Sequence, residues 1–165
     1  MVKGWSFIVV ITLIIGCGKG KSEQATMATA EAALSFKNIP NALAFNSAVD
    51  SVMATWSEYQ AMDESFAVLR RASNPEDAIL ALDDLIEKER AVANAAYPEA
   101  FDQIQVKSRQ RVIRTFLLKI RNNLEDRRPI DSVMIQLADA HNALRNQFNI
   151  IMIDTLDIKK LLSEE

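Results

Sequence analysis

Apolar residues recur at helical spacing along most of the chain. From residue 41 to 72 the spacings alternate mostly between four and three, as on one face of an α-helix. Similar patterns predict helices over residues 74–96, 98–126 and 129–162, with Asn or Pro at the junctions. The residues expected to face inward on the first three segments are Phe45, Val49, Val52, Trp56, Tyr59, Phe66 and Leu69, then Ile79, Leu82, Leu85, Ile86 and Val92, then Phe101, Ile104, Ile113, Phe116, Leu117, Ile120 and Leu124.

The last segment has the most regular repeat. Two sets of residues, each spaced seven apart, interleave along it and predict a coiled-coil-like seam. Because short connectors place neighbouring helices antiparallel, we expect an all-α fold, an antiparallel up-and-down bundle of about four long helices. The Ala-rich residues 26–35 are a candidate for a fifth helix. The two sets in the seam are Ile130, Leu137, Leu144, Ile151 and Ile158, and Met134, His141, Phe148, Thr155 and Leu162.

The first 16 residues have the pattern of a signal peptide. Lys3 gives a positive start, and Trp5 to Ile15 form a largely apolar run of 11 residues. A helix that spans a membrane needs about 20 apolar residues, so this run is too short for one. We therefore expect residues 1–16 to be removed, although an uncleaved N-terminal anchor is the alternative.

The end of this run carries a short motif, Ile14-Ile15-Gly16-Cys17. It resembles the lipobox of bacterial lipoproteins, where branched apolar residues and a small residue precede a modified cysteine. The resemblance implies diacylglycerol transfer to the sulfur of Cys17, cleavage between Gly16 and Cys17, and acylation of the new amino group, palmitate being a typical chain. Two or three acyl chains anchor a protein stably, since each buried methylene contributes about 0.8 kcal/mol.

The residues after the cysteine bear on the destination. Gly18 stands where an aspartate would retain an enteric lipoprotein at the inner membrane, so the resemblance implies the outer membrane. The chain also resembles the small helical lipoproteins of Bacteroidota, a likeness of type that carries no functional residue across. Residues 18–23 lack the acidic cluster that marks surface export in that group, which favours the periplasmic face. We expect residues 17–25 to be the lipidated cysteine and its tether, and residues 26–165 to be the helical domain.

Cysteine content and charge support this assignment. Cys17 is the only cysteine, so the chain has no disulfide, and lipidation would account for a lone thiol in an exported protein. Without Lys3 the mature chain has 18 Lys and Arg residues against 22 Asp and Glu residues, a net charge of −4. A negative total gives no indication of a nucleic-acid partner.

His141, the only histidine, is expected in the seam. One hypothesis is haem ligation, with Met62 of the first long segment as the second ligand, as in cytochrome b-type bundles. The alternative is a partly buried histidine at the edge of the bundle, bonded to Asp139 or Asn142 and acting as a register device. We favour the alternative and expect no cofactor, because only one residue and a fold analogy support haem.

Basic residues gather on the third segment. Lys107, Arg111, Arg114 and Arg121 share a helical face, which could dock on anionic lipid headgroups or an acidic partner. The alternative is a solvated face paired with acidic residues of the second segment, which we favour. The acidic residues considered for this pairing are Glu76, Asp77, Asp83, Asp84, Glu87 and Glu89.

Two smaller groups of residues could each form a binding site or have only a structural role. The carboxylates of residues 83–89 have i, i+4 spacing that could suit a metal, but Glu-to-Lys pairing explains them equally well. Trp56 and Tyr59 could form an aromatic platform, although core packing is the favoured role. The chain has no nucleophile elbow, Walker loop or zincin motif, so we do not expect an enzyme.

Three functions therefore stand as hypotheses. The leading one is a non-enzymatic, membrane-anchored envelope lipoprotein that binds another envelope protein or assists assembly. The second is a haem or small-ligand bundle centred on His141. The third is a membrane-surface module that uses the basic face of residues 98–126.

Overall fold

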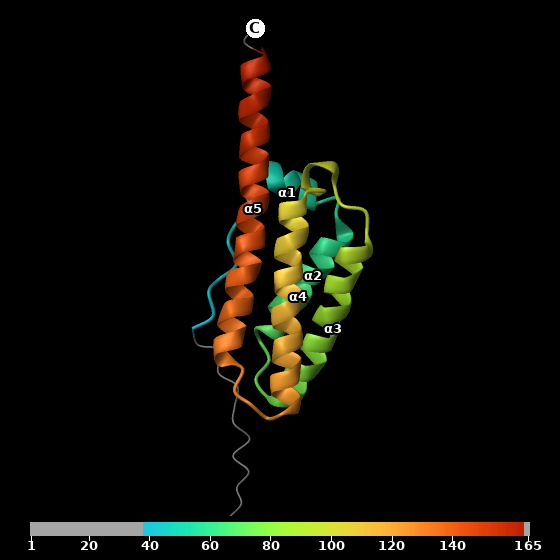
Figure 1. The fold of residues 1–165 in the computed structure, drawn as a ribbon, viewed down its shortest axis with the longest axis vertical. Coiled ribbons are helices and arrows are strands. Elements are labelled where there is room, and N and C mark those ends of the chain that lie inside the picture. Colours follow the sequence, from blue (N-terminus) through green and yellow to red (C-terminus); the bar gives the residue numbers. More distant parts are fainter. Residues whose placement is uncertain (1–37, 164–165) are drawn as a thin grey trace, which may run out of the picture. The chain divides into compact units, whose positions relative to one another are not determined.

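The computed structural model describes the backbone of residues 38–163 and the side chains of residues 38–155. Contacts divide the chain into two units, residues 1–30 and 31–165, and the described residues belong to the second. All the secondary-structure elements of the described part are helices and none is a strand (Figure 1), which confirms the all-α class. None of its helices is both long enough and apolar enough to cross a membrane. The Ala-rich residues 26–35 lie outside the described part.

Two predicted helices form nearly as expected, α3 (Pro75–Asn94) and α5 (Asp131–Ser163). The start of α3 follows from local chemistry. The side chain of Asn74 accepts a hydrogen bond from the backbone N–H of Asp77 at 2.8 Å, and Pro75 occupies the first turn, where its missing N–H costs nothing. The acidic residues Glu76 and Asp77 lie in the same turn, near the positive end of the helix dipole.

The prediction of one helix over residues 41–72 is wrong. Residues 41–46 are extended, α1 (Ser47–Met53) follows, and α2 (Ser57–Leu69) begins only after a break at residues 54–56. This stretch contains no Gly or Pro, so no helix breaker explains the break. Packing does, because Trp56 at the break is buried among the rings of Tyr59 and Tyr97, whose centroids lie 5.3 and 5.1 Å from that of Trp56.

The predicted helix over residues 98–126 is shorter than expected. A single 3-10 turn, η1 (Glu99–Phe101), comes first, and α4 (Ile104–Glu125) begins after it. Ile104 was expected to face inward, yet it is 64% exposed. As the first residue of α4 it precedes the point where the helix reaches the core, and Phe101 on the turn is fully buried instead.

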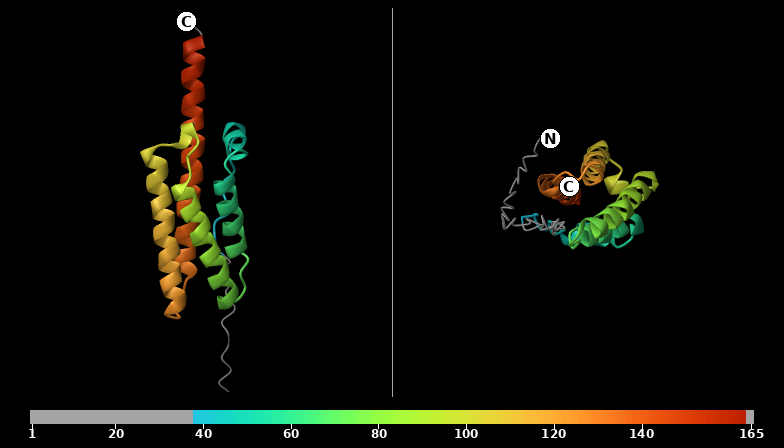
Figure 2. Two further views of the ribbon diagram at one scale, coloured as in Figure 1. Left: turned by 90° about the vertical axis from the view of Figure 1, so that its right-hand side faces the viewer. Right: turned by 90° about the horizontal axis from the view of Figure 1, so that it is seen from below.

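The long helices lie side by side in a helical-bundle-like arrangement. α2 packs against α3, α3 against α4, and α4 against α5 (Figure 2). α1 and η1 both contact α5, and α5 continues beyond them (Figure 1). α2 and α5 are joined by long side chains, which form the site described below.

The seam predicted for the last segment lines the core. Met134, Leu137, His141, Leu144 and Phe148 are each at most 2% exposed. The side chains of Ile158 and Leu162 lie outside the described part of the chain. An aromatic cluster, which includes Phe148 of the seam, fills the end of the core near α1. Its members are Phe45, Trp56, Tyr59, Tyr97, Phe101 and Phe148.

The end of α4 is a tight left-handed turn. Arg127 has φ of 53°, the only positive φ among the described residues, and no glycine supplies it. The N–H of Arg128 bonds to the carbonyl of Asn123 at 2.7 Å and that of Arg127 to the carbonyl of Leu124 at 3.1 Å. These two bonds form a Schellman cap, which usually has glycine at the left-handed position.

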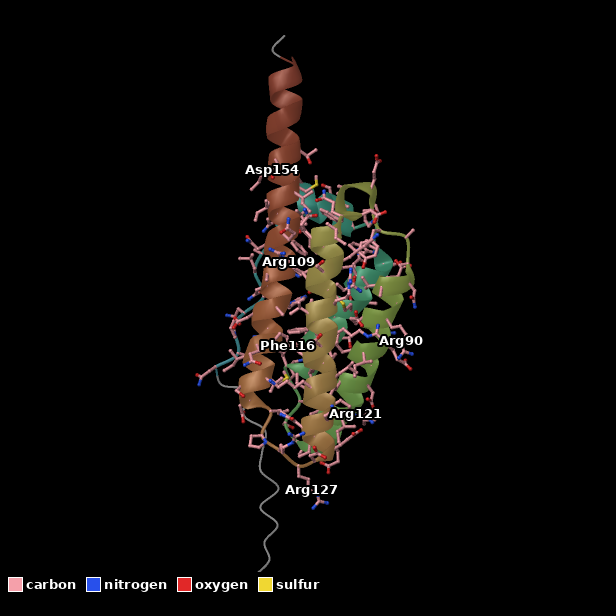
Figure 3. All side chains as sticks on the ribbon, viewed as in Figure 1. Arg90, Arg109, Phe116, Arg121, Arg127 and Asp154 are labelled. Atoms are coloured by element: carbon pink, nitrogen blue, oxygen red, sulfur yellow. The ribbon has the colours of Figure 1, made fainter. Side chains whose placement is uncertain are left out.

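We predict that Arg127→Gly raises the free energy of unfolding by about 0.5–1 kcal/mol, because glycine adopts positive φ without the Cβ clash. Arg127 projects from the end of α4 (Figure 3), so its side chain contributes little packing. Urea denaturation followed by circular dichroism measures the change. Arg128→Gly is the matched control and should not stabilise the fold. A less stable Arg127→Gly protein would contradict this account of the turn.

Candidate functional site: a main-chain clamp on α5

The extended residues 39–46, here called the arm, lie along α5 and are held by asparagine side chains. Asn142 accepts a hydrogen bond from the N–H of Leu43 and donates one to the carbonyl of Asn41, both at 2.8 Å. Asn149 repeats the arrangement with the N–H of Asn46 at 2.9 Å and the carbonyl of Ala44 at 3.0 Å. A carboxamide has one acceptor and two donor hydrogens, so it pairs with a peptide backbone much as a neighbouring strand does.

The spacing of the two asparagines fits an extended chain. Residues 142 and 149 are two helical turns apart, about 10.5 Å along the axis. The N–H groups they hold are three extended residues apart, about 10 Å. The helix and the arm run in the same direction and therefore stay in register over the length of the arm.

Arg145 lies between the two asparagines and is 7% exposed. Its Nε donates to the carbonyl of Leu43 at 2.5 Å, and its NH1 donates to Asp63 of α2 at 2.8 Å. Its guanidinium also covers the ring of Phe45, 3.7 Å from the ring centroid, in a cation–π contact. One side chain thus joins the arm, α2 and α5, and we call Asn142, Arg145 and Asn149 the clamp.

Asp63 accepts from a second partner, His141, whose Nε2 lies 3.1 Å from the same carboxylate oxygen. Burial by itself would raise the pKa of Asp63, but His141 and Arg145 outweigh it and hold the pKa below its ordinary value of 3.8. Tyr59 also lies next to His141, with its hydroxyl 3.5 Å from the same Nε2. Burial, and then the charge of Asp63, raise the pKa of Tyr59, so this hydroxyl stays protonated.

The other end of the arm is fixed by α2. Arg70, at the end of α2, donates to the carbonyl of Pro40 and, at 3.4 Å, to that of Ile39. Asn46 then begins α1 by accepting from the N–H of Val49 at 2.8 Å. The arm is therefore held at both ends and in the middle, chiefly through its backbone.

The structure buries His141 more deeply than expected and gives it a different partner. It is 2% exposed, stacks on Phe66 with ring centroids 4.4 Å apart, and bonds to Asp63 across the core. Asn142, a predicted partner, binds the arm instead. Met62 is also buried, as the haem hypothesis required. The arrangement does not fit haem, because Nε2, which would hold the iron, is bonded to Asp63.

The basic residues of α4 pair largely within the protein. Arg114 lies 3.5 Å from Glu89, and Arg121 pairs with Asp83 as well as with Glu125 at 2.8 Å. Figure 3 shows Arg121 on the side of α4 that faces α3. Lys107 pairs with Asp102, and the exposed Arg111 donates from Nε to the carbonyl of Lys107 at 3.4 Å. The favoured interpretation, pairing with the acidic residues of α3, is confirmed for Arg114 and Arg121.

The other two patterns also have structural roles. Asp84 accepts from the hydroxyl of Ser65 at 2.6 Å and pairs with Lys88. Among the described residues no three His, Cys, Asp or Glu side chains come together as metal ligands do. Trp56 and Tyr59 are 3% and 1% exposed, so they form core instead of an open platform.

Sequence reasoning missed a second buried polar group, between α3 and α4. Glu89 is 1% exposed, and burial raises its pKa although Arg114 and Gln110 oppose the shift. Gln110 donates to Glu89 Oε1 at 3.3 Å and accepts from the hydroxyl of Tyr97. Burial also raises the pKa of Tyr97, to about 12. We interpret this group as a device that fixes the pairing of α3 with α4.

The clamp was missed too, although one signal of it is present in the sequence. Asn142 and Asn149 are seven residues apart, next to the apolar seam, and Arg145 lies between them. Asparagines spaced seven apart beside apolar residues spaced seven apart indicate a polar edge on this helix. The sequence does not indicate which segment that edge binds, and the fold shows that it is the arm. The residues predicted for lipidation and cleavage, Gly16 and Cys17, lie outside the described residues.

Comparison of the chain with protein-family models, with curated proteins and with solved structures found no match. The arrangement of side chains is therefore the only guide to the chemistry of the site. Its polar groups bind backbone amides and one another, and its only imidazole is committed to a carboxylate. This chemistry holds the arm to the helices.

We predict that acid weakens the fold through Asp63. Because its pKa is lowered on folding, the stability it contributes is present above pH 3.8 and is lost as the pH falls through the folded-state pKa. Asp63→Asn should cost about 1–2 kcal/mol at pH 7, a value reduced by water screening because the side chain is 36% exposed. It should also flatten the decline of stability below pH 3.8.

Urea denaturation at pH values from about 2 to about 7, which bracket the ordinary carboxyl pKa of about 4, measures both effects. Glu64→Gln, an exposed neighbour on α2, is the matched control and should keep the wild-type profile. An Asp63→Asn protein with the wild-type acid profile would show that the carboxylate does not hold the clamp.

Proposed function

We propose that this protein is a non-enzymatic envelope lipoprotein that is anchored through Cys17 and serves in protein interaction or assembly. In this proposal the chain is cleaved after Gly16, carries acyl chains such as palmitate on Cys17, and faces the periplasm from the outer membrane. The lipobox residues 14–17 and the apolar run before them support the anchor. The anchor would hold the protein at a membrane without spanning it.

The clamp is the observation that carries the proposal furthest. The chain that leads from Cys17 enters the helical domain as the arm, which α5 holds by its backbone along residues 41–46. A domain attached to a lipid in this way is fixed at its point of entry.

We include in the proposal the antiparallel up-and-down arrangement of α2, α3, α4 and α5. The pairwise packing of successive helices and the short connections at residues 70–74, 95–103 and 126–130 support it. Such a bundle presents long helix faces to partners. The internal pairing of His141 and of the basic residues of α4 makes the haem and membrane-surface hypotheses the weaker alternatives.

We predict that Cys17→Ser abolishes metabolic labelling with a palmitate analogue and moves the protein from the membrane fraction to the soluble fraction. Ser22→Ala, in the same segment, is the control and should remain labelled and membrane-bound. Labelling that persists in Cys17→Ser would overturn the anchor.

The interaction half of the proposal is tested by purification of the tagged protein from membranes in mild detergent. A stable envelope protein should copurify at fixed stoichiometry and survive washing with salt, which screens exposed charges. Repeated purification of the protein alone would leave only a structural role for it.

A further inference from the structure

We propose that the clamp binds residues 41–46 of a second copy of this chain as well as its own, so that two copies exchange arms. The arm is held mainly by contacts to its backbone. Asn142 and Asn149 bind backbone N–H and carbonyl groups, and Arg145 binds the carbonyl of Leu43. None of these bonds depends on the arm belonging to the same molecule.

The break between α1 and α2 provides a hinge. Residues 54–56 contain no Gly or Pro, and the spacing of Val49, Val52 and Trp56 continues the helical pattern through them. The same residues can therefore form one continuous helix from α1 into α2. Straightening of this hinge would carry the arm and α1 away from their own α5, as in the exchange of an element between protomers.

An empty clamp loses contacts that another arm can restore. Arg145 is 7% exposed with the arm in place, and without the arm it loses the carbonyl of Leu43 and the ring of Phe45 while Asp63 still holds it. Water can replace the carbonyl as a partner, but it does not replace the cation–π contact with Phe45. The arm fits the spacing of the two asparagines and places Phe45 under Arg145. The arm of a second copy is therefore the best replacement for the departed one.

This inference deepens the proposed interaction role, because it names the partner, but it does not require the lipid. An anchor on Cys17 would only raise the local concentration of copies, and a high effective concentration favours binding between molecules. Failure of the Cys17 test would therefore leave the clamp experiment below unaffected.

The direct test uses a fluorescein-labelled, end-capped peptide of residues 38–47 and the detergent-solubilised full-length protein. Fluorescence anisotropy should report saturable binding that is at least tenfold tighter for Phe45→Ala than for wild type, because the weakened arm competes less for the clamp. Phe45→Leu serves if Phe45→Ala fails to fold. A peptide N-methylated at Leu43 and Asn46 keeps every side chain but lacks the two N–H donors, and it should not bind.

Dimer formation is measured by sedimentation of the full-length protein over a range of concentrations. Wild type should form dimers, and the double variant Asn142→Leu/Asn149→Leu should be monomeric. Asn146→Leu, exposed on the same helix, is the matched control and should dimerise as wild type does. Absence of peptide binding, equal binding of the N-methylated peptide, a wild type that stays monomeric, or dimers that persist in the double variant would each overturn the proposal.

Discussion

The ion pair between Arg145 and Asp63 is the interaction on which the described structure most depends. It joins α5 to α2 across a gap that long side chains fill, and the same guanidinium binds the carbonyl of Leu43 and covers Phe45. Because Arg145 is nearly fully buried, each of its partners must stay in place for the others to remain satisfied. The arm, α2 and α5 are therefore coupled through one side chain, and His141 extends the coupling into the core through Asp63.

The sequence predicts the helices whose position depends on one apolar face. It does not predict the features that depend on contacts between residues far apart in the chain. The heptads of residues 130–151 and the Asn74-Pro75 start are local signals, and both identify real elements. The break at residues 54–56 has no local cause, since it depends on rings contributed by residues 97, 101 and 148. The clamp likewise joins residues about 100 positions apart, and neither periodicity nor spacing within one segment predicts such a pairing.

Two segments of the chain carry the proposed function. The lipobox resemblance concerns residues 14–17, and the clamp concerns the segment by which the chain enters its helical domain. A helix whose side chains bind backbone groups is suited to hold polypeptide, and the Nε2 of His141 already lies 3.1 Å from Asp63. Binding of polypeptide is thus the chemistry common to the arm, the proposed interaction role and the proposed exchange of arms.

Hydrogen exchange of individual amides, followed by nuclear magnetic resonance, tests the clamp most directly. The N–H groups of Leu43 and Asn46 lie in an extended segment outside any helix, so only Asn142 and Asn149 account for their protection. The account predicts slow exchange at both amides in wild type, and fast exchange in Asn142→Leu and Asn149→Leu respectively, while the amides of α3 are unchanged. Exchange at Leu43 and Asn46 as fast as in an unfolded chain, in the folded wild-type protein, would contradict it.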